Sequence, residues 1–221
     1  MNSQSITRVL LIASLLVAGS GAARAADASF DAELAAIQRD WDAAKFQTSD
    51  KHARTAELEK LADRAAKLSA ANPQRVEAAT WEGIVLSTYA GEVSAFSAMK
   101  YAKGALAALE RAERMNPAAL QGGVYASLGA LYSKVPGGFM GFGDDQRAAE
   151  YFRKALAVAA DNIDNNFFYG EYLVDQGAYA QARTVLSHAL EAPTVEGRPV
   201  FDAGRRAEIR ELLAVAQRKT H

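Results

Sequence analysis

The sequence predicts an all-α protein of about nine helices, arranged as four stacked helix pairs and one C-terminal capping helix. Half of its 221 residues are hydrophobic, alanine is abundant and only five are proline, a composition that favours helices. Apolar residues recur at intervals of three and four, as on one face of a helix. Groups of packing residues also recur at spacings of 43 and then 34 residues. Such repetition is typical of a helical solenoid, in which neighbouring helix pairs share a core.

The N-terminus has the three-part layout of a secretory signal peptide. Arg8 precedes an uncharged apolar run from Val9 to Ala22, and Ala23 and Ala25 supply small residues at a cleavage site. The run is too short for a membrane span of about 20 residues. We therefore expect a signal peptide over 1–25, cleavage after Ala25, and a repeat domain over 26–221. A buried N-terminal helix is the alternative, but the run lacks a polar face. The expected product is periplasmic or secreted, with no membrane span after cleavage.

The composition argues against several classes of function. Lys and Arg number 25 against 26 Asp and Glu, and the two signs are interspersed, whereas nucleic-acid binding calls for a basic face. There is no cysteine, so no disulfide, thiolate metal site or cysteine nucleophile can form. The three histidines, His52, His188 and His221, lie far apart in the sequence. We expect no enzyme activity, no catalytic residue, no metal and no cofactor.

The first helices are indicated by apolar stripes and capping residues. Asp31 to Phe46 carries one apolar stripe, and Asp50 offers an N-cap for a second helix that ends near Ala71. Asn-Pro follows at Asn72 and recurs at Asn116. Because Asn is a good N-cap and Pro is favoured at the first helical position, each pair is predicted to end one helix and start the next.

The strongest structural signal is a small–large–small pattern on the second helix of each pair. Small residues let two helix backbones approach, and the large residue fills the remaining gap. An irregular helical bundle is the alternative to a regular solenoid. The three copies are Ala105, Leu109, Ala112, then Ala148, Phe152, Ala155, and then Ala182, Leu186, Ala189.

These residues resemble the tetratricopeptide repeat (TPR). The best copy comprises Gly170, Gly177, Tyr179, Ala182, Leu186 and Ala189, and the preceding copy begins with Leu128, Gly129 and Tyr132. The resemblance implies a right-handed solenoid of helical hairpins. In the two central copies, the 16 residues from Tyr89 to Ala105 and from Tyr132 to Ala148 exceed the family spacing. We therefore expect two inter-helix connections that are each about seven residues too long.

A narrower resemblance covers roughly Trp81 to Arg218. The run from Gly122 to Gly138 contains Val-Pro-Gly-Gly, and Gly143-Asp144 and the helix of Ala148 follow it. This run is similar to the T-component (TatT) family of TRAP-type periplasmic transporters. The resemblance implies binding to a protein partner such as a periplasmic solute-binding protein, not catalysis.

The glycine-rich stretch from Gly137 to Gly143 is the most distinctive connection. It lacks the Gly-Lys-Ser/Thr of a phosphate-binding loop. It is either a loop folded back on its own repeat or a loop that contacts a ligand over the groove. Asp144 is expected to cap the next helix, and Asp161–Asn166 to form a helix-start turn rather than a calcium site.

In the TPR register, the first helix of each pair lines a concave groove. Taking Leu86, Gly129 and Gly170 as equivalent positions predicts three rows of groove residues. These are Thr80, Gly83, Ser87 and Ala90; Gly123, Ala126, Ala130, Ser133 and Lys134; and Asp164, Phe167, Glu171, Val174 and Asp175. Either loops or the N-terminal helix fill this groove, or it is a slot for an extended peptide or small ligand.

Two functional hypotheses follow. The first is an exported, non-enzymatic TPR-like scaffold that binds a protein or peptide partner. Its candidate contact residues are Lys134, Phe139, Met140, Phe142, Asp164, Phe167, Glu171 and Asp175. The second is an accessory or small-ligand-binding component of a TRAP-type periplasmic solute transporter, with an apolar cavity near Tyr132, Phe139, Phe142 and Phe167. The last helix, Phe201 to Arg218, is expected to cap the solenoid.

Overall fold

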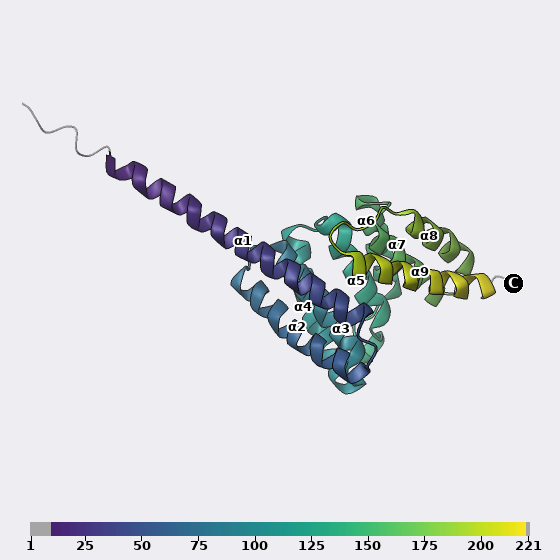
Figure 1. The fold of residues 1–221 in the computed structure, drawn as a ribbon. Helices are drawn as coiled ribbons and strands as arrows, with labels where there is room; N and C mark the ends of the chain where they lie inside the picture. Colours follow the sequence, from purple (N-terminus) through teal and green to yellow (C-terminus); the bar gives the residue numbers. More distant parts are fainter. Residues whose placement is uncertain (1–9, 220–221) are drawn as a thin grey trace, which may run out of the picture.

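The computed structural model describes residues 10–219, with side chains from residue 24 onward. Within this range the chain forms nine α-helices in adjacent antiparallel pairs, and the fold is TPR-like (Figure 1). Each helix packs chiefly on its neighbours in sequence, and α1 also packs on α9. The helices are α1 (Leu10–Phe46), α2 (Lys51–Ala71), α3 (Val76–Glu92), α4 (Ala95–Met115), α5 (Gly123–Lys134), α6 (Asp145–Val158), α7 (Ile163–Asp175), α8 (Tyr179–Glu191) and α9 (Pro199–Lys219).

The small–large–small pattern forms the centre of each repeat, as the sequence predicts. All nine of its side chains, on α4, α6 and α8, are 0% exposed. A glycine on the first helix of each pair faces the large residue. A Cβ on Gly83 would lie 2.5 Å from Leu109, one on Gly129 would lie 2.7 Å from Phe152, and one on Gly170 would lie 2.5 Å from Leu186. This close approach of the two backbones is what the pattern encodes.

The predicted register is wrong in α3. The sequence predicts that Leu86 matches Gly129 and Gly170, but the glycine that meets the large residue is Gly83, about one helical turn earlier. Thr80 and Gly83 are therefore buried in the repeat rather than in the groove. The 43-residue spacing holds between the second helices, whereas α3 is displaced by one turn relative to α4.

The two long connections differ, although the sequence predicts equal lengths. Residues 135–144 form a true loop with a short 3₁₀ turn at Gly138–Met140. Between α3 and α4, by contrast, only Val93 and Ser94 lie outside a helix, because the extra residues lengthen both helices. Pro136 and the glycines stop helix propagation in the first case, whereas the second has no proline and a single glycine, Gly91, in the last turn of α3.

The caps are partly as expected. Asp50, Asp144 and Asn162 each accept a hydrogen bond from the first turn of the following helix. The Asn-Pro pairs act differently: Asn72 and Asn116 are the C-caps of α2 and α4, and the next helices begin several residues later. Each Asn-Pro pair therefore ends a helix and begins a turn, but does not start the next helix.

Helix α1 is longer than the expected Asp31–Phe46 and runs through the predicted cleavage site without a break. The alanine-rich residues around Ala25 are strong helix formers. Its N-terminal half extends away from the rest of the fold (Figure 1). Residues 24–29 are exposed, and burial begins at Phe30, where Arg75 of the α2–α3 turn covers the ring at 4.2 Å. Within residues 10–219 no helix is long and apolar enough to cross a membrane.

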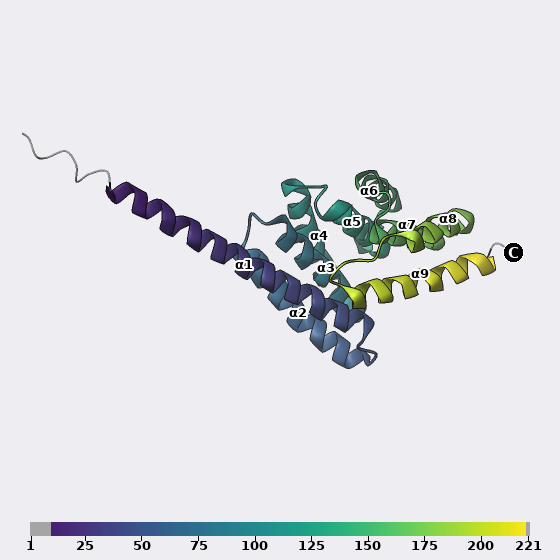
Figure 2. The same ribbon diagram turned by 45° about the horizontal axis from the view of Figure 1, so that its top comes forward.

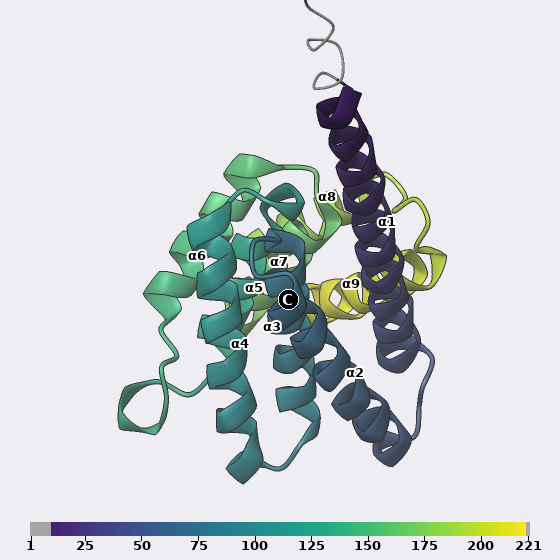
Figure 3. The same cartoon turned by 90° about the vertical axis from the view of Figure 1, so that its left-hand side faces the viewer.

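Helix α9 does more than cap the last repeat. Figure 2 shows its first turns beside the C-terminal end of α1, with the remainder running under α7 and α8. Figure 3 shows α4 and α6 on the opposite side of the molecule from α1. The first and last helices therefore meet, and they close the concave side of the solenoid.

Candidate functional site

A cavity of about 850 Å³ lies on the concave side of the helices. Its walls come from α1, α3, α5, α7 and α9, together with the first turns of α4. This volume lies within the range of small-molecule binding pockets, about 300–1,000 Å³. The cavity is the place where the fold offers both space and a mixture of apolar and charged side chains.

The closure between α1 and α9 combines an aromatic cluster with a buried ion pair. Trp41 and Phe46 of α1 lie 6.4 and 6.1 Å from Phe201 of α9, between ring centroids. Nε of Arg198 donates a hydrogen bond of 3.1 Å to Asp42, whose side chain is almost fully buried. Burial raises the pKa of Asp42, and this effect outweighs the Arg198 hydrogen bond, which lowers it. The charged form of Asp42 is therefore stabilised chiefly by Arg198.

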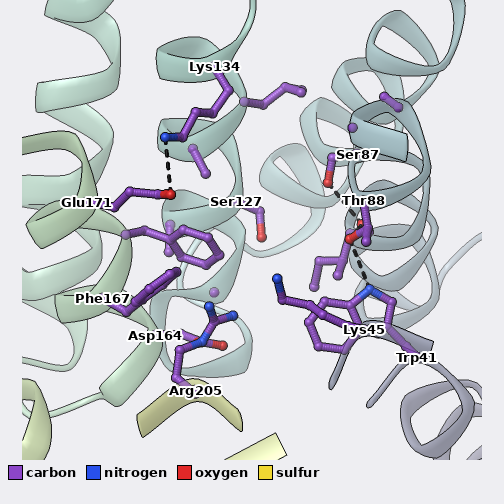
Figure 4. A pocket seen from close by; sticks show the side chains of 18 of the residues that line it. Trp41, Lys45, Ser87, Thr88, Ser127, Lys134, Asp164, Phe167, Glu171 and Arg205 are labelled. Carbon is purple, nitrogen blue, oxygen red and sulfur yellow. Dashed lines mark hydrogen bonds and ion pairs between the residues drawn. The ribbon is translucent and has the colours of Figure 1, made fainter. Parts of the chain in front are cut away.

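The floor of the cavity beside α9 is centred on Arg205. Its side chain is 2% exposed, and its guanidinium lies 3.9 Å above the ring of Phe167. Nε lies 2.7 Å from Asp164 Oδ1 but is not aligned for a hydrogen bond, so neither atom has a hydrogen-bond partner. Nη1 donates to Glu208, which also pairs with Lys45 at 2.8 Å. Figure 4 shows Arg205 and Lys45 reaching into the cavity from different walls.

The opposite end of the cavity is marked by Lys134. Its Nζ lies 3.2 Å from Glu171 and 2.6 Å from Asp175. Desolvation lowers the pKa of Lys134, but these carboxylates outweigh it and raise the pKa above its ordinary value. Lys134 is therefore charged at neutral pH. Between the two ends, Trp41 Nε1 donates to Thr88 Oγ1, which positions the indole ring against the wall (Figure 4).

The predicted contact residues fall into two groups. Lys134, Asp164, Phe167 and Glu171 line the cavity, and Asp175 lies beside Lys134 at its edge. Phe139, Met140 and Phe142 belong to the 135–144 loop and do not line it. Phe139 is 101% exposed and Met140 62% exposed, whereas Phe142 packs edge-on against Tyr132.

The predicted apolar cavity near Tyr132, Phe139, Phe142 and Phe167 is not where the structure places one. Tyr132 is buried and stacks on Tyr151 of α6 at 5.7 Å. It therefore faces the core between α5 and α6, while Phe167 faces the concave side. Helical spacing alone does not distinguish these two faces of the repeat.

Sequence reasoning also missed the contribution of α1 and α9. Trp41, Lys45, Arg198, Phe201 and Arg205 all line the cavity, yet none was a candidate. The one available signal was Arg205, which lies between Phe201 and Ile209 at four-residue spacing and so shares their helix face. Five more residues of the predicted groove line the cavity as expected: Ser87, Ala90, Gly123, Ala126 and Ala130. Ser133 and Val174, which the sequence also places in the groove, do not line it.

Within the described residues no group of three or more His, Cys, Asp or Glu side chains is arranged to hold a metal ion. His188 pairs with Asp161 at 3.0 Å on the exposed outer surface of α8. The described acidic residues of the cavity pair with basic ones. The arrangement can bind an occupant by shape, aromatic contact and hydrogen bonding.

Comparison with solved structures supports the fold. A thermophilic TPR protein from Thermus thermophilus superimposes with a TM-score of 0.55 at 20% sequence identity, over 88% of this chain and 95% of that one. No protein-family model matches the sequence, and no curated protein matches it either. The TPR-like architecture thus rests on the structural likeness and on the repeat packing.

Proposed function

We propose that this chain is an exported, non-enzymatic TPR-like binding protein that holds a segment of a protein or peptide partner in its concave cavity. The observation that carries the proposal is the space of about 850 Å³ between the inner helices, with aromatic walls and converging polar groups. Such a combination is the usual form of a binding site. Repeat solenoids also present rigid concave surfaces to their partners.

The 135–144 loop is proposed as a second contact region at the mouth of the cavity. Val135 and Pro136 line the cavity, and the loop folds against α4, where a Cβ on Gly141 would lie 2.9 Å from Met99. Phe139 and Met140 then project into solvent. Two exposed apolar side chains on one loop tip favour contact with a partner.

Export is proposed from the N-terminal sequence pattern. The described side-chain contacts of α1 with the body begin at Asp27 and Asp31, which pair with Arg75. Removal of residues 1–25 would therefore leave these contacts intact. Mass determination of the mature N-terminus from a periplasmic fraction tests this proposal, with Ala26 as the expected first residue.

A second candidate is the small-ligand-binding accessory of a TRAP-type periplasmic solute transporter. The contact between α1 and α9 favours it, because this contact turns an open groove into a pocket of ligand size. In this case the occupant is a solute, and the partner is a solute-binding protein that exchanges it.

The test uses one cavity-filling variant and one control. Ser127 points into the cavity (Figure 4), so Ser127→Phe occupies the space without burying a new charge. Gln181 lies exposed on the outer helix α8, and Gln181→Phe adds the same ring there. We expect a partner captured from periplasmic extract by the wild type to be retained by Gln181→Phe and lost by Ser127→Phe. Equal capture by both variants would place the binding site elsewhere.

A further inference from the structure

The charges around the cavity floor are balanced within the wall itself. Three cations and three carboxylates meet there, and every one has an opposite partner. The pairs are Lys45 with Glu208 at 2.8 Å, Arg198 with Asp42 at 3.1 Å, and Arg205 with Asp164 at 2.7 Å and with Glu208. The floor therefore carries no net charge.

The other charged side chains of the lining are paired as well. Glu92 pairs with Arg54 at 2.9 Å, and Glu171 pairs with Lys134 at 3.2 Å. The additional carboxylate of Asp175 is exposed beside Lys134, at the edge. An ionic occupant would consequently lose part of its hydration without gaining an unpaired counter-charge, which is unfavourable.

The surfaces between these pairs are apolar. Both tryptophans of the chain, Trp41 and Trp81, border the cavity and are each 5% exposed, and Ile84, Met99 and Phe167 also line it. Such walls favour aliphatic or aromatic groups, because burial of apolar surface contributes about 25 cal/mol per Å².

The guanidinium of Arg205 has hydrogen-bonding capacity to spare. Its Nε is buried and lacks an aligned acceptor, although Asp164 Oδ1 lies 2.7 Å away, and its Nη1 donates to Glu208. The guanidinium points into the cavity (Figure 4) although the side chain is only 2% exposed. A buried donor of this kind favours an acceptor oxygen on the occupant.

We infer that the occupant of the cavity is uncharged and amphipathic, with an apolar body against the tryptophans and an acceptor oxygen directed at Arg205. This inference rests on the proposed function and narrows it to one ligand chemistry. That chemistry is found both in neutral small molecules and in peptide segments without charged side chains. The neutral floor selects against carboxylate and ammonium ligands alike.

The test exploits the position of the two tryptophans. Because Trp41 and Trp81 both border the cavity, we expect their intrinsic fluorescence to change when it is occupied. In one arm the full mature chain is titrated with 1-decanol, decanoate and decylammonium below their aggregation concentrations. In the other, N-acetylated, C-amidated apolar hexapeptides carry Ser, Asp or Lys at one central position. In the arm whose probes bind, we expect the uncharged probe to bind at least tenfold more tightly than either charged probe.

Two charge-shifting variants make the prediction specific to the floor. Glu208→Gln leaves one excess positive charge at the floor. We expect the affinity for decanoate, or for the Asp peptide, to rise at least tenfold relative to the affinity for the neutral probe. Lys45→Gln leaves one excess negative charge, and the relative affinity for decylammonium, or for the Lys peptide, should rise instead. Glu211→Gln removes a charge from the exposed side of the same helix α9 and should leave the order unchanged. A merely structural role of Glu208 or Lys45 would not produce opposite preferences.

The outcomes separate the two levels of the proposal. Tightest binding of a charged probe to the wild type, or unaltered preferences in both floor variants, overturns the inference while the cavity stays a binding site. If no probe in either arm changes the fluorescence, both the inference and the proposed function fail.

Discussion

The two ends of the cavity are built in opposite ways. At the floor, α1 and α9 meet through buried aromatic rings and an ion pair between residues 156 positions apart in sequence. At the mouth, the 135–144 loop leaves Phe139 fully exposed. The difference indicates that the floor shapes and stabilises the cavity, whereas the mouth is available for contact. Substitutions at the two ends should therefore separate stability from binding.

The largest expected effect comes from the same substitution made at both ends. Phe201 is 3% exposed and contacts two rings of α1, so Phe201→Ala should lower the free energy of unfolding by about 3–5 kcal/mol. Phe139→Ala should change it by less than about 0.5 kcal/mol. Urea denaturation followed by circular dichroism measures both. Comparable losses would contradict the division between floor and mouth.

The ion pair of the closure gives the next largest effect. Arg198→Met leaves the buried Asp42 carboxylate unpaired, and the expected loss is about 3 kcal/mol at pH 7. The matched change Arg64→Met breaks half-exposed pairs with Glu33 and Asp40 and should cost no more than about 1 kcal/mol.

The loss in Arg198→Met should also depend on pH. Burial already raises the pKa of Asp42, and removal of Arg198 raises it further. A carboxyl with a raised pKa in the folded state binds its proton more readily there than in the unfolded chain, so stability falls as the pH rises through that pKa. The deficit of Arg198→Met should therefore shrink as the pH is lowered and Asp42 becomes neutral. A pH-independent deficit would show that the unpaired charge is not its cause.

A smaller effect on stability, but a clear effect on binding, is expected at the mouth. The double variant Phe139→Ser/Met140→Ser should unfold within about 0.5 kcal/mol of the wild type, because both side chains are exposed. We expect it to weaken capture of a protein partner. Unchanged capture would assign the loop a structural role only.

The smallest effect should follow removal of residues 1–25. The described contacts of α1 begin at Asp27, so a chain starting at Ala26 keeps the whole closure. Its denaturation midpoint should match that of a chain carrying the N-terminal segment. A lower midpoint would mean that this segment stabilises the fold.

The contrast between the two ends also explains what the sequence could predict. The loop was visible because Pro136 and its neighbouring glycines interrupt a helical pattern locally. The repeat core was visible because Ala148, Phe152 and Ala155 recur at fixed spacing. Both signals lie within a few turns of one helix pair.

The floor was invisible for the converse reason. Nothing local links Asp42 to Arg198 or Trp41 to Phe201, because their contact depends on how far the solenoid curves. That curvature is the sum of many small rotations between helix pairs. For the same reason the sequence pattern does not reveal the one-turn displacement of α3, and it places Thr80 and Gly83 in the groove rather than in the core.

The central claim is that the occupant lies in the cavity closed by α1 and α9. Native mass spectrometry of the protein purified from its own host tests this claim most directly, with wild type, Ser127→Phe and Gln181→Phe compared side by side. The account predicts an added mass on the wild type and on Gln181→Phe that is absent from Ser127→Phe. The same added mass on all three proteins would contradict it.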